Sequence, residues 1–480
     1  MTGWIPDQDA LKWYPHFDKY LSPEKAGKVA TDAHRVATNS FFPLLRYVQA
    51  WQPFRTKITK GTLKERPIRY ASRRDAYIYS YYRKLLSERY EAELARLGIS
   101  ACPIAYRKIP VEGGSGGKCN IHFAKDVFDV ISDIGNCTVV ALDISKFFEH
   151  LDHYKLKKIW ARMLGVNQLP ADHFAVYSSL TKYSYVERDD LYKRLGIIQE
   201  KIVNGRTVEF YTVPFDKMPL QLCTSAQFRE LVAGENGVHS SLIKKNEFEY
   251  GIPQGTPLSD LLANMYLIDF DVALENYASS RGGRYFRYSD DILLIIPGSA
   301  SEGVNAEKFA QMSILASGKN LVIKSSKTIM VEFKKAGDLL SYSIPAGYQN
   351  KNGLEYLGFR FDGKHVYLRD STLSNLYRKM SKVLYHECLA LVKRYRDKTP
   401  AQIVPLFDLD AVHARFSRVE DFEKYADSKR NWTFWTYARR ASEIMGERGT
   451  KIPYQLKSNR LNFEAMFLEK LSFAYARINK

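Results

Sequence analysis

The chain has 480 residues, 45% of them hydrophobic, so it can bury a large core and is globular rather than disordered. Its 71 lysines and arginines exceed its 53 aspartates and glutamates, which gives a formal net charge of +18. Together with 32 tyrosines and 26 phenylalanines, that charge favours a surface that binds polyanions and stacks on bases. A charge that serves solubility alone is the alternative.

Cysteine usage and the N-terminus indicate a cytoplasmic protein without a membrane partner. The five cysteines are widely spaced and include no Cys-x-x-Cys pair, which argues against a zinc or redox centre and for reduced thiols. The N-terminus lacks a basic region followed by an apolar run, and no window approaches the length of a membrane span.

The first predicted element is a helix over 30–51, in a region of about sixty residues whose role the sequence does not indicate. The next segment, 53–89, is densely basic, which favours an element that faces phosphates. Its basic residues are Arg55, Lys57, Lys60, Lys64, Arg66, Arg69, Arg73, Arg74, Arg83, Lys84 and Arg89.

The glycine-rich segment 113–118 is similar to a phosphate-binding loop but lacks two of its required residues. Glu112 stands where the first glycine belongs, and Cys119 stands where Ser or Thr belongs, so a flexible turn is expected. A helix is predicted over 121–131. A buried strand follows over 138–142 and ends on Asp143.

Residues 165–245 mix helix and strand signals. After them, 251–259 reads as a tight loop that enters a helix, with Thr256 as the expected N-cap and Pro257 in the first helical position. Apolar residues then recur at helical spacing and are expected to face the core. They are Leu258, Leu261, Leu262, Met265 and Val272.

Two adjacent carboxylates, Asp290 and Asp291, lie between segments rich in aromatic and β-branched residues, 284–288 and 292–296. Gly and Pro punctuate both ends, so a β-hairpin with the acidic pair near its turn is predicted. Neighbouring carboxylates repel each other and need a cation or a basic partner to stay ionised together. By itself the pair also fits a solvated turn.

The last third of the chain begins with an apolar strand predicted over 321–323, followed by Lys327 and Thr328. A short apolar hairpin is predicted around Gly358. Beyond residue 360 the pattern is mostly helical, and 364–400 holds nine basic residues against three acidic ones, which indicates a basic helical region.

Taken in order, the strand carboxylate, the Pro-Gln-Gly loop, the Tyr-x-Asp-Asp hairpin, the Lys-Thr pair and the Leu-Gly turn resemble the palm of reverse transcriptases over about 64–359. The resemblance implies an α+β right-hand polymerase whose palm contains an antiparallel sheet. The implied domains are an N-terminal extension at 1–60, fingers at 61–141, a palm at 142–359 with an insertion at about 165–245, and a helical thumb or C-terminal domain at 360–480.

The resemblance also implies roles for individual residues. Asp143, Asp290 and Asp291 would bind two Mg²⁺ ions, or Mn²⁺ in their place, with the Ile144 carbonyl as an additional ligand. Lys327 is similar to the lysine proposed to protonate pyrophosphate. The implied nucleotide-binding residues are Lys64, Arg66, Arg69, Ile144, Phe148, Gln254 and Gly255, and the implied primer contacts are Tyr288, Ser289, Tyr356, Leu357 and Gly358.

One aromatic residue is expected to select the sugar. Family members carry, five residues after the first aspartate, an aromatic that packs against the sugar and excludes a 2′-hydroxyl, and Phe148 holds that position. Of Phe147 and Phe148, one is expected to pack in the core, and Phe148 is favoured as the gate.

The implied activity is RNA-directed DNA synthesis from dNTPs. The segments 66–77, 105–108 and 431–441 resemble bacterial defence-associated and abortive-infection reverse transcriptases, whereas the Val-Thr-Gly and Asn-Ala-x-x-His signatures of retron enzymes are absent. This subgroup implies antiphage defence, a structured noncoding RNA as template and scaffold, a DNA product and a homo-oligomer. Template-independent or protein-primed synthesis is one alternative, and a catalytically inactive RNA-binding scaffold is another.

Overall fold

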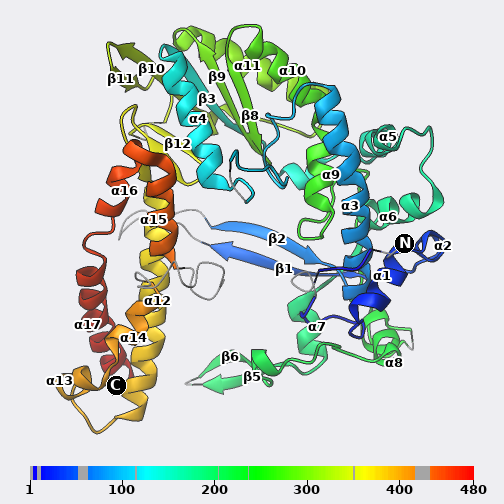
Figure 1. Ribbon diagram of the computed structural model, residues 1–480. Helices are drawn as coiled ribbons and strands as arrows, with labels where there is room; N and C mark the ends of the chain where they lie inside the picture. The colour runs from blue at the N-terminus through cyan, green and yellow to red at the C-terminus, as the bar shows by residue number, and fades with distance from the viewer. Residues whose placement is uncertain are drawn as a thin grey trace.

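The computed structural model describes residues 4–7, 12–51, 63–113, 116–203, 205–235, 237–349, 352–416 and 433–479. Figure 1 shows a sheet with its helices at the top, a mixed group of strands and helices at the right and below, and a column of helices at the left. This mixed α+β architecture matches the predicted palm, fingers and thumb of a right-hand polymerase. No helix in the described ranges combines the length and the apolar composition needed to cross a bilayer.

The palm is built on a five-stranded antiparallel sheet in the order β11-β10-β3-β9-β8. Its strands are β3 (Cys137–Asp143), β8 (Arg284–Tyr288), β9 (Asp291–Pro297), β10 (Ile329–Ala336) and β11 (Leu339–Ser343). The predicted strand before Asp143 and the predicted Asp-Asp hairpin are therefore confirmed.

Both faces of this sheet are covered, which explains the continuous apolar run in β9. Ile292 and Leu294 pack on the side of α9 (Ser259–Tyr266), α10 (Ile268–Ser279) and α11 (Ala300–Ser317). Leu293 and Ile295 face the other side. They join a core that includes α4 (Asn120–Ile134) and the C-terminal helices.

The fingers contain a second sheet in the order β2-β1-β4-β7. Its strands are β1 (Leu44–Trp51), β2 (Lys64–Tyr70), β4 (Ser184–Glu187) and β7 (Lys244–Lys245). The surrounding helices are α1 (Pro23–Thr31), α2 (Ala33–Ala37), α3 (Arg73–Arg96), α5 (His153–Leu164) and α6 (Ala171–Thr181).

The predicted helix over 30–51 is wrong, because the chain forms the end of α1, then α2 and then β1. Asp32 interrupts the helix with an extended backbone and caps α2 by accepting a hydrogen bond from the Arg35 amide at 3.1 Å. Pro43, which has no N–H to donate, immediately precedes β1. The strand then pairs with β2 from Leu45 to Trp51.

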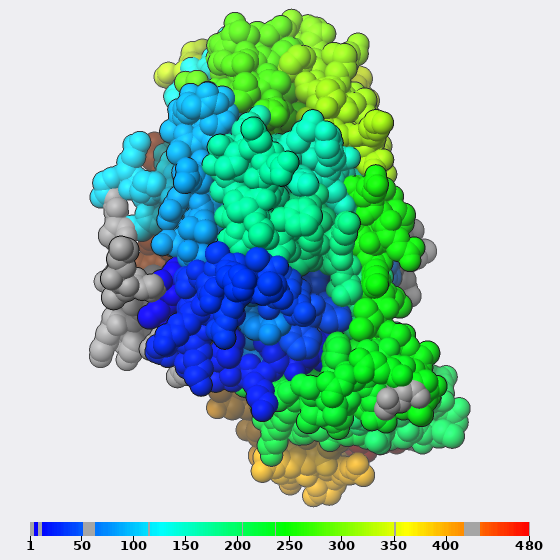
Figure 2. Space-filling view, turned by 90° about the vertical axis from the view of Figure 1, so that its right-hand side faces the viewer, coloured from blue at the N-terminus to red at the C-terminus, as the bar shows by residue number. Residues whose placement is uncertain are grey.

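Residues 165–245 extend the fingers sheet, since β4 pairs in parallel with β1 and β7 pairs with β4. The rest of this stretch holds α7 (Arg188–Arg194), the hairpin of β5 (Ile198–Val203) and β6 (Arg206–Tyr211), and α8 (Ser225–Gln227). Figure 2 shows the N-terminal residues, in blue, between the α5–α6 region and the part of this stretch that follows α6. The His16 amide donates to the Leu220 carbonyl there at 2.9 Å, so residues 12–51 are an integral part of the fingers.

The C-terminal part begins with a small sheet of β12 (Leu354–Tyr356), β13 (Phe359–Phe361) and β14 (Val366–Leu368), which confirms the hairpin predicted around Gly358. The helices after it confirm the mostly helical pattern. They are α12 (Asp370–Arg394), α13 (Pro400–Ile403), α14 (Leu409–Ala414), α15 (Phe434–Met445), α16 (Lys451–Tyr454) and α17 (Asn459–Ile478). Apolar residues of α12 and α17 share one core.

Smaller expectations had mixed outcomes. The helix over 121–131 is confirmed as part of α4, and all five cysteines are free. The strand over 321–323 is reduced to a single bridge between Ile323 and Ile144. Thr256 is not the N-cap, because α9 starts at Ser259. Arg55, Lys57, Lys60, residues 114–115 of the glycine-rich turn, and residues 431–432 of the third defence-like segment lie outside the described residues.

Candidate active site

The three predicted carboxylates lie at one end of the palm sheet. Antiparallel pairing of β3 with β9 places Asp143 directly opposite Asp291. Asp290 lies in the turn between β8 and β9, and its carbonyl accepts a hydrogen bond from the Ile144 amide at 3.1 Å. Strand register alone therefore brings together residues 147 positions apart in the chain, as 290 − 143 = 147.

Negative charge is concentrated at this end of the sheet. Burial raises the pKa of Asp290, and the Asp143 carboxylate raises it further. Asp291 keeps contact with solvent, but its pKa is raised to about 7. The main cause is the loss of water around the carboxylate where other atoms pack against it, and the Asp290 and Asp143 carboxylates add to the rise. Such a site favours a bound cation, which would allow the carboxylates to be ionised together.

The donor chemistry fits a hard divalent cation, since carboxylate and carbonyl oxygens are the ligands that Mg²⁺ takes from proteins. Within the described ranges, however, no group of three or more His, Cys, Asp or Glu side chains is gathered closely enough to hold a metal ion as placed. The Lys327 ammonium instead donates to Asp143 Oδ2 at 2.5 Å. Ligation would therefore require Lys327 to move aside and the carboxylates to turn inward.

Lys327 is presented by a turn that α11 holds in place. The buried Glu307 carboxylate accepts from the Thr328 hydroxyl at 2.9 Å and from the Tyr348 hydroxyl at 2.8 Å. Gln311 of the same helix donates to Ser325 Oγ at 2.9 Å. Contacts on both sides of Lys327 thus fix the backbone from which its ammonium reaches the carboxylates.

A pocket of about 500 Å³ opens beside the carboxylates. Nine residues with predicted roles line it: Lys64, Arg66, Asp143, Ile144, Phe148, Gln254, Ser289, Asp290 and Lys327. Six further residues complete the lining: Glu65, Pro67, Tyr106, Lys146, Phe147 and Glu149. The pocket therefore joins basic groups on β2, an aromatic pair and the acidic turn, as a nucleoside triphosphate site requires.

Arg69 does not join this pocket. Its guanidinium lies over the rings of Tyr183 and Tyr185, 5.4 and 5.5 Å from their centroids, and the residue is buried. The predicted contact of Arg69 with a triphosphate is therefore not supported by its placement. Its role here is to join β2 to the segment around β4 through cation–π contacts.

The primer-contacting residues were predicted on two hairpins. Ser289 lines the pocket, whereas the Tyr288 ring packs toward Tyr106 and Phe123, with centroids 6.3 and 6.5 Å away. Leu357 and Gly358 form the tight β12–β13 turn, with φ of 45° and 94°. Tyr356 is buried with a hydroxyl that lacks a hydrogen-bond partner among the described residues.

Phe147 and Phe148 pack edge to face with their ring centroids 5.7 Å apart. Both line the pocket, but Phe147 is 3% exposed and Phe148 is 9% exposed. The more exposed ring is the one predicted to select the sugar.

The Gln254 loop is docked on β2 by close backbone contact. The Arg69 amide donates to the Gln254 carbonyl at 2.8 Å. Gly255 has a φ of 118°, and a Cβ at this position would lie 2.8 Å from the Arg69 carbonyl oxygen and 2.9 Å from Ile68 Cγ2. Only glycine fits this approach without displacing the loop.

We therefore expect Gly255→Ala to push the loop off β2 and to raise the KM for the nucleotide by about tenfold, because even a small displacement of a positioning group weakens catalysis. Steady-state kinetics would measure it. Gly337→Ala is the matched control, since its φ is 58° but a Cβ there meets nothing within 4 Å. An unchanged KM in Gly255→Ala would show that the loop does not bind the nucleotide.

Sequence reasoning assigned no site role to Tyr106, Lys146 or Glu149, although all three line the pocket. Glu149 and Lys146 closely follow Asp143 in the chain, so their proximity was readable from the sequence. Tyr106 is more than thirty residues away, and no periodicity or spacing connects it to the carboxylates.

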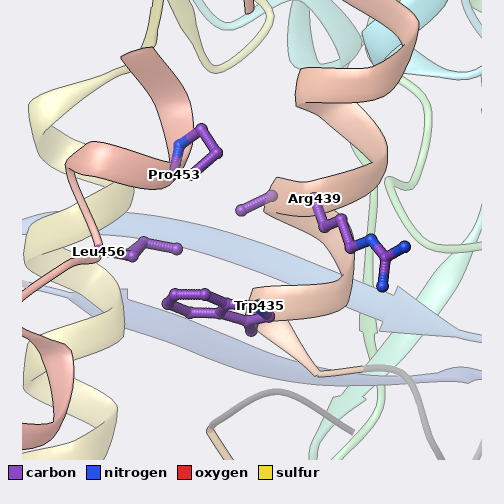
Figure 3. A pocket seen from close by; sticks show the side chains of 5 residues that line it. Trp435, Arg439, Pro453 and Leu456 are labelled. Atoms are coloured by element: carbon purple, nitrogen blue, oxygen red, sulfur yellow. The ribbon is translucent and has the colours of Figure 1, made fainter. Parts of the chain in front are cut away.

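A second pocket, of about 300 Å³, lies among the C-terminal helices and is lined by Trp435, Ala438, Arg439, Pro453 and Leu456 (Figure 3). Among the described residues that line it, Arg439 is the one that carries a charge, and Glu443 accepts a hydrogen bond from Arg439 at 2.8 Å. The described lining of this mostly apolar pocket includes no acidic residue, in contrast to the palm pocket, which combines acidic and basic groups.

Comparison with known proteins gives a local sequence match. No protein-family model matches the chain. The retron Ec86 reverse transcriptase of Escherichia coli is 43% identical over 77 residues, which are 16% of this chain and 23% of that enzyme. The chain thus matches less than a quarter of this curated relative's length. This match confirms the resemblance to reverse transcriptases, even though the retron signatures named above are absent.

Similar solved structures include two telomerases in complex with a TWJ fragment of telomeric RNA. The Candida tropicalis enzyme has a TM-score of 0.36 and 12% identity, and the alignment covers 95% of this chain and 68% of that chain. The Candida albicans enzyme has a TM-score of 0.36 and 10% identity, with 99% and 72% covered. Likeness at these TM-scores carries no functional argument.

Proposed function

From this relationship to reverse transcriptases, we propose that the chain is an RNA-directed DNA polymerase that joins dNTPs along an RNA template. One observation carries the proposal. Cross-strand pairing places Asp143 opposite Asp291, with Asp290 in the adjoining turn, and Asp143 and Asp290 line a pocket that Lys64 and Arg66 also line.

Each part of the pocket has a task in nucleotidyl transfer. Asp143, Asp290, Asp291 and the Ile144 carbonyl would hold two Mg²⁺ ions, or Mn²⁺, which when bound activate a 3′-hydroxyl and stabilise the leaving pyrophosphate. Lys64 and Arg66 bind the triphosphate through charge-assisted hydrogen bonds. Lys327 donates a proton from Nζ to pyrophosphate.

The direct test is incorporation of labelled dNTPs on a defined RNA template annealed to a DNA primer. We expect extension that stops when the nucleotide complementary to the next template base is omitted. Failure of the native chain to extend any primed or co-purifying RNA template with Mg²⁺ or Mn²⁺ would overturn the proposal.

Sugar selection gives a sharper prediction. We expect Phe148→Ala to raise rNTP use relative to dNTP use by about 10- to 100-fold, because the ring no longer excludes the 2′-hydroxyl. The ratio of kcat/KM for the two nucleotides measures it. Phe147→Ala is the matched control, since this more buried ring should affect stability more than the ratio. An unchanged ratio in Phe148→Ala would exclude it as the gate.

The biological setting is part of the proposal. A net charge of +18 supports an extended RNA partner, and the defence-like segments support a structured noncoding RNA as template and scaffold, with antiphage defence as the role. We place this activity in the cytoplasm and include a homo-oligomer as the acting form. Sequencing the nucleic acid that co-purifies with the chain tests the template assignment.

Template-independent or protein-primed synthesis by the same palm is the second candidate, and the match to a reverse transcriptase favours it less than templated synthesis. Products without a matching tract in the bound RNA, or products that stay attached to protein after denaturation, would favour it. An inactive RNA-binding scaffold is the candidate of another class. Phage resistance retained by an Asp143→Ala strain would favour the scaffold.

A further inference from the structure

Tyr106 has a backbone conformation that a tyrosine rarely adopts. Its φ is 61°, and among the described residues only five that are not glycine have a positive φ. Three of the five, Tyr106, Lys146 and Ser289, line the palm pocket. Left-handed backbone costs a bulky L-residue of order 1–3 kcal/mol, and it persists where the surrounding structure imposes it.

The surrounding structure does impose this conformation. Arg83 Nη2 donates to the Tyr106 carbonyl at 3.1 Å, and Asn264 Nδ2 donates to the preceding carbonyl, that of Ala105, at 2.8 Å. The Arg107 side chain, only 5% exposed, donates to the Pro103 carbonyl at 2.7 Å and forms an ion pair with Glu91. The residues on both sides of Tyr106 are thus held in place.

The Tyr106 residue is 44% exposed and lines the palm pocket. Its hydroxyl lies 3.5 Å from Ser289 Oγ, in the turn that carries Asp290. Lys64 and Arg66 line the same pocket and attract phosphates. A nucleotide or nucleic acid whose phosphates they bind therefore brings a base close to the Tyr106 ring. The Tyr106 ring packs toward Tyr288, with centroids 6.3 Å apart, and this contact still leaves the residue exposed in the pocket lining.

We propose that Tyr106 contacts a nucleobase, the one at the 3′ end of the primer, by offering its ring face for stacking. An aromatic ring accepts any base on its face, and a basic pocket supplies the attraction for the phosphates. The contact rests on the proposed polymerase function. It adds a base-binding residue to a site otherwise described by its carboxylates, basic groups and sugar gate.

The test compares the affinities of the protein for two duplexes, measured without dNTPs and in the presence of EDTA. The first is an RNA template annealed to a DNA primer, and the second is the same duplex with an abasic nucleotide at the 3′ end of the primer. We expect wild type and Tyr106→Phe to bind the abasic duplex about 5- to 100-fold more weakly than the complete duplex. Tyr106→Gly should bind both duplexes equally. The control Tyr154→Ala removes a 67% exposed tyrosine outside the pocket and should behave as wild type.

Thermal unfolding separates this role from a structural one. Tyr106→Gly should keep or raise the Tm, because glycine adopts a positive φ without strain. A marked fall in the Tm of Tyr106→Gly would overturn the proposal. So would an equal preference of wild type and Tyr106→Gly for the complete duplex over the abasic one. A third contrary result is a loss of binding that occurs only when the template base opposite the primer end is removed. Because no dNTP is present, these outcomes are independent of whether the chain polymerises DNA.

Discussion

Asp143→Asn and Asp290→Asn should each lower dNTP incorporation by at least about a thousandfold. Each substitution keeps the shape of the side chain and removes one negative charge from the end of the sheet where Asp143 faces Asp291. Loss of a charged metal ligand removes several kcal/mol of transition-state stabilisation, and about 4 kcal/mol corresponds to three powers of ten in rate. Single-turnover extension of a primed RNA template would measure the loss.

Asp291→Asn should cost less activity, since Asp290 is favoured as the direct ligand. Asp269→Asn, on the surface of α10, is the control and should retain activity. Extension by Asp143→Asn and Asp290→Asn at the wild-type rate would remove the carboxylates from the mechanism.

The stability of wild type and that of Asp291→Asn should depend differently on pH. The pKa of Asp291 is raised from its ordinary 3.8 to about 7, so the folded state disfavours the ionised carboxylate and loses stability as the pH rises through that interval. Without divalent metal, Asp291→Asn should therefore unfold at a higher temperature than wild type at pH 8. The difference should disappear near pH 4, and Mg²⁺ should raise the Tm of wild type more than that of Asp291→Asn.

Asp271→Asn should destabilise the palm by about 3–5 kcal/mol, because it leaves the Arg287 guanidinium buried without a counter-charge. The two side chains are fully buried and form a bidentate pair at 2.7 and 2.6 Å. Arg287 Nη1 also donates to the Ser289 carbonyl at 3.1 Å, so the pair supports the turn that carries Asp290. Denaturant unfolding followed by tryptophan fluorescence would measure the change.

The same helix offers a matched control. Asp269 of α10 pairs with Arg162 at 2.9 Å, but both side chains are about half exposed. Asp269→Asn should therefore change stability by no more than about 1 kcal/mol. Replacing both buried partners, with Asp271→Leu and Arg287→Met, should recover part of the loss. Equal effects of Asp269→Asn and Asp271→Asn would show that burial does not govern this pair.

Local patterns predicted well where a segment carried its own signals. The Asp290 hairpin has an aromatic strand and a β-branched strand between Gly and Pro, and the turn at Gly358 has a residue suited to positive φ. Both were therefore predictable without the rest of the chain. Residues 44–51 carry no such local signal, and their prediction as helix was wrong. Their apolar content suits helix or strand equally, and pairing with Lys64–Tyr70 and with the distant Ser184–Glu187 decides for strand.

The sequence by itself determined that Asp143 ends a strand and that Asp290 and Asp291 lie at the turn of a hairpin, because both are short-range patterns. Only the tertiary structure decided which side chains face the pocket. It turned Arg69 toward two tyrosines, brought Tyr106 beside Ser289, and joined His16 and β1 to the distant residues Leu220 and β4 of the fingers. The physical reason is that register and side-chain direction depend on partners more than a hundred residues away, which no local spacing encodes.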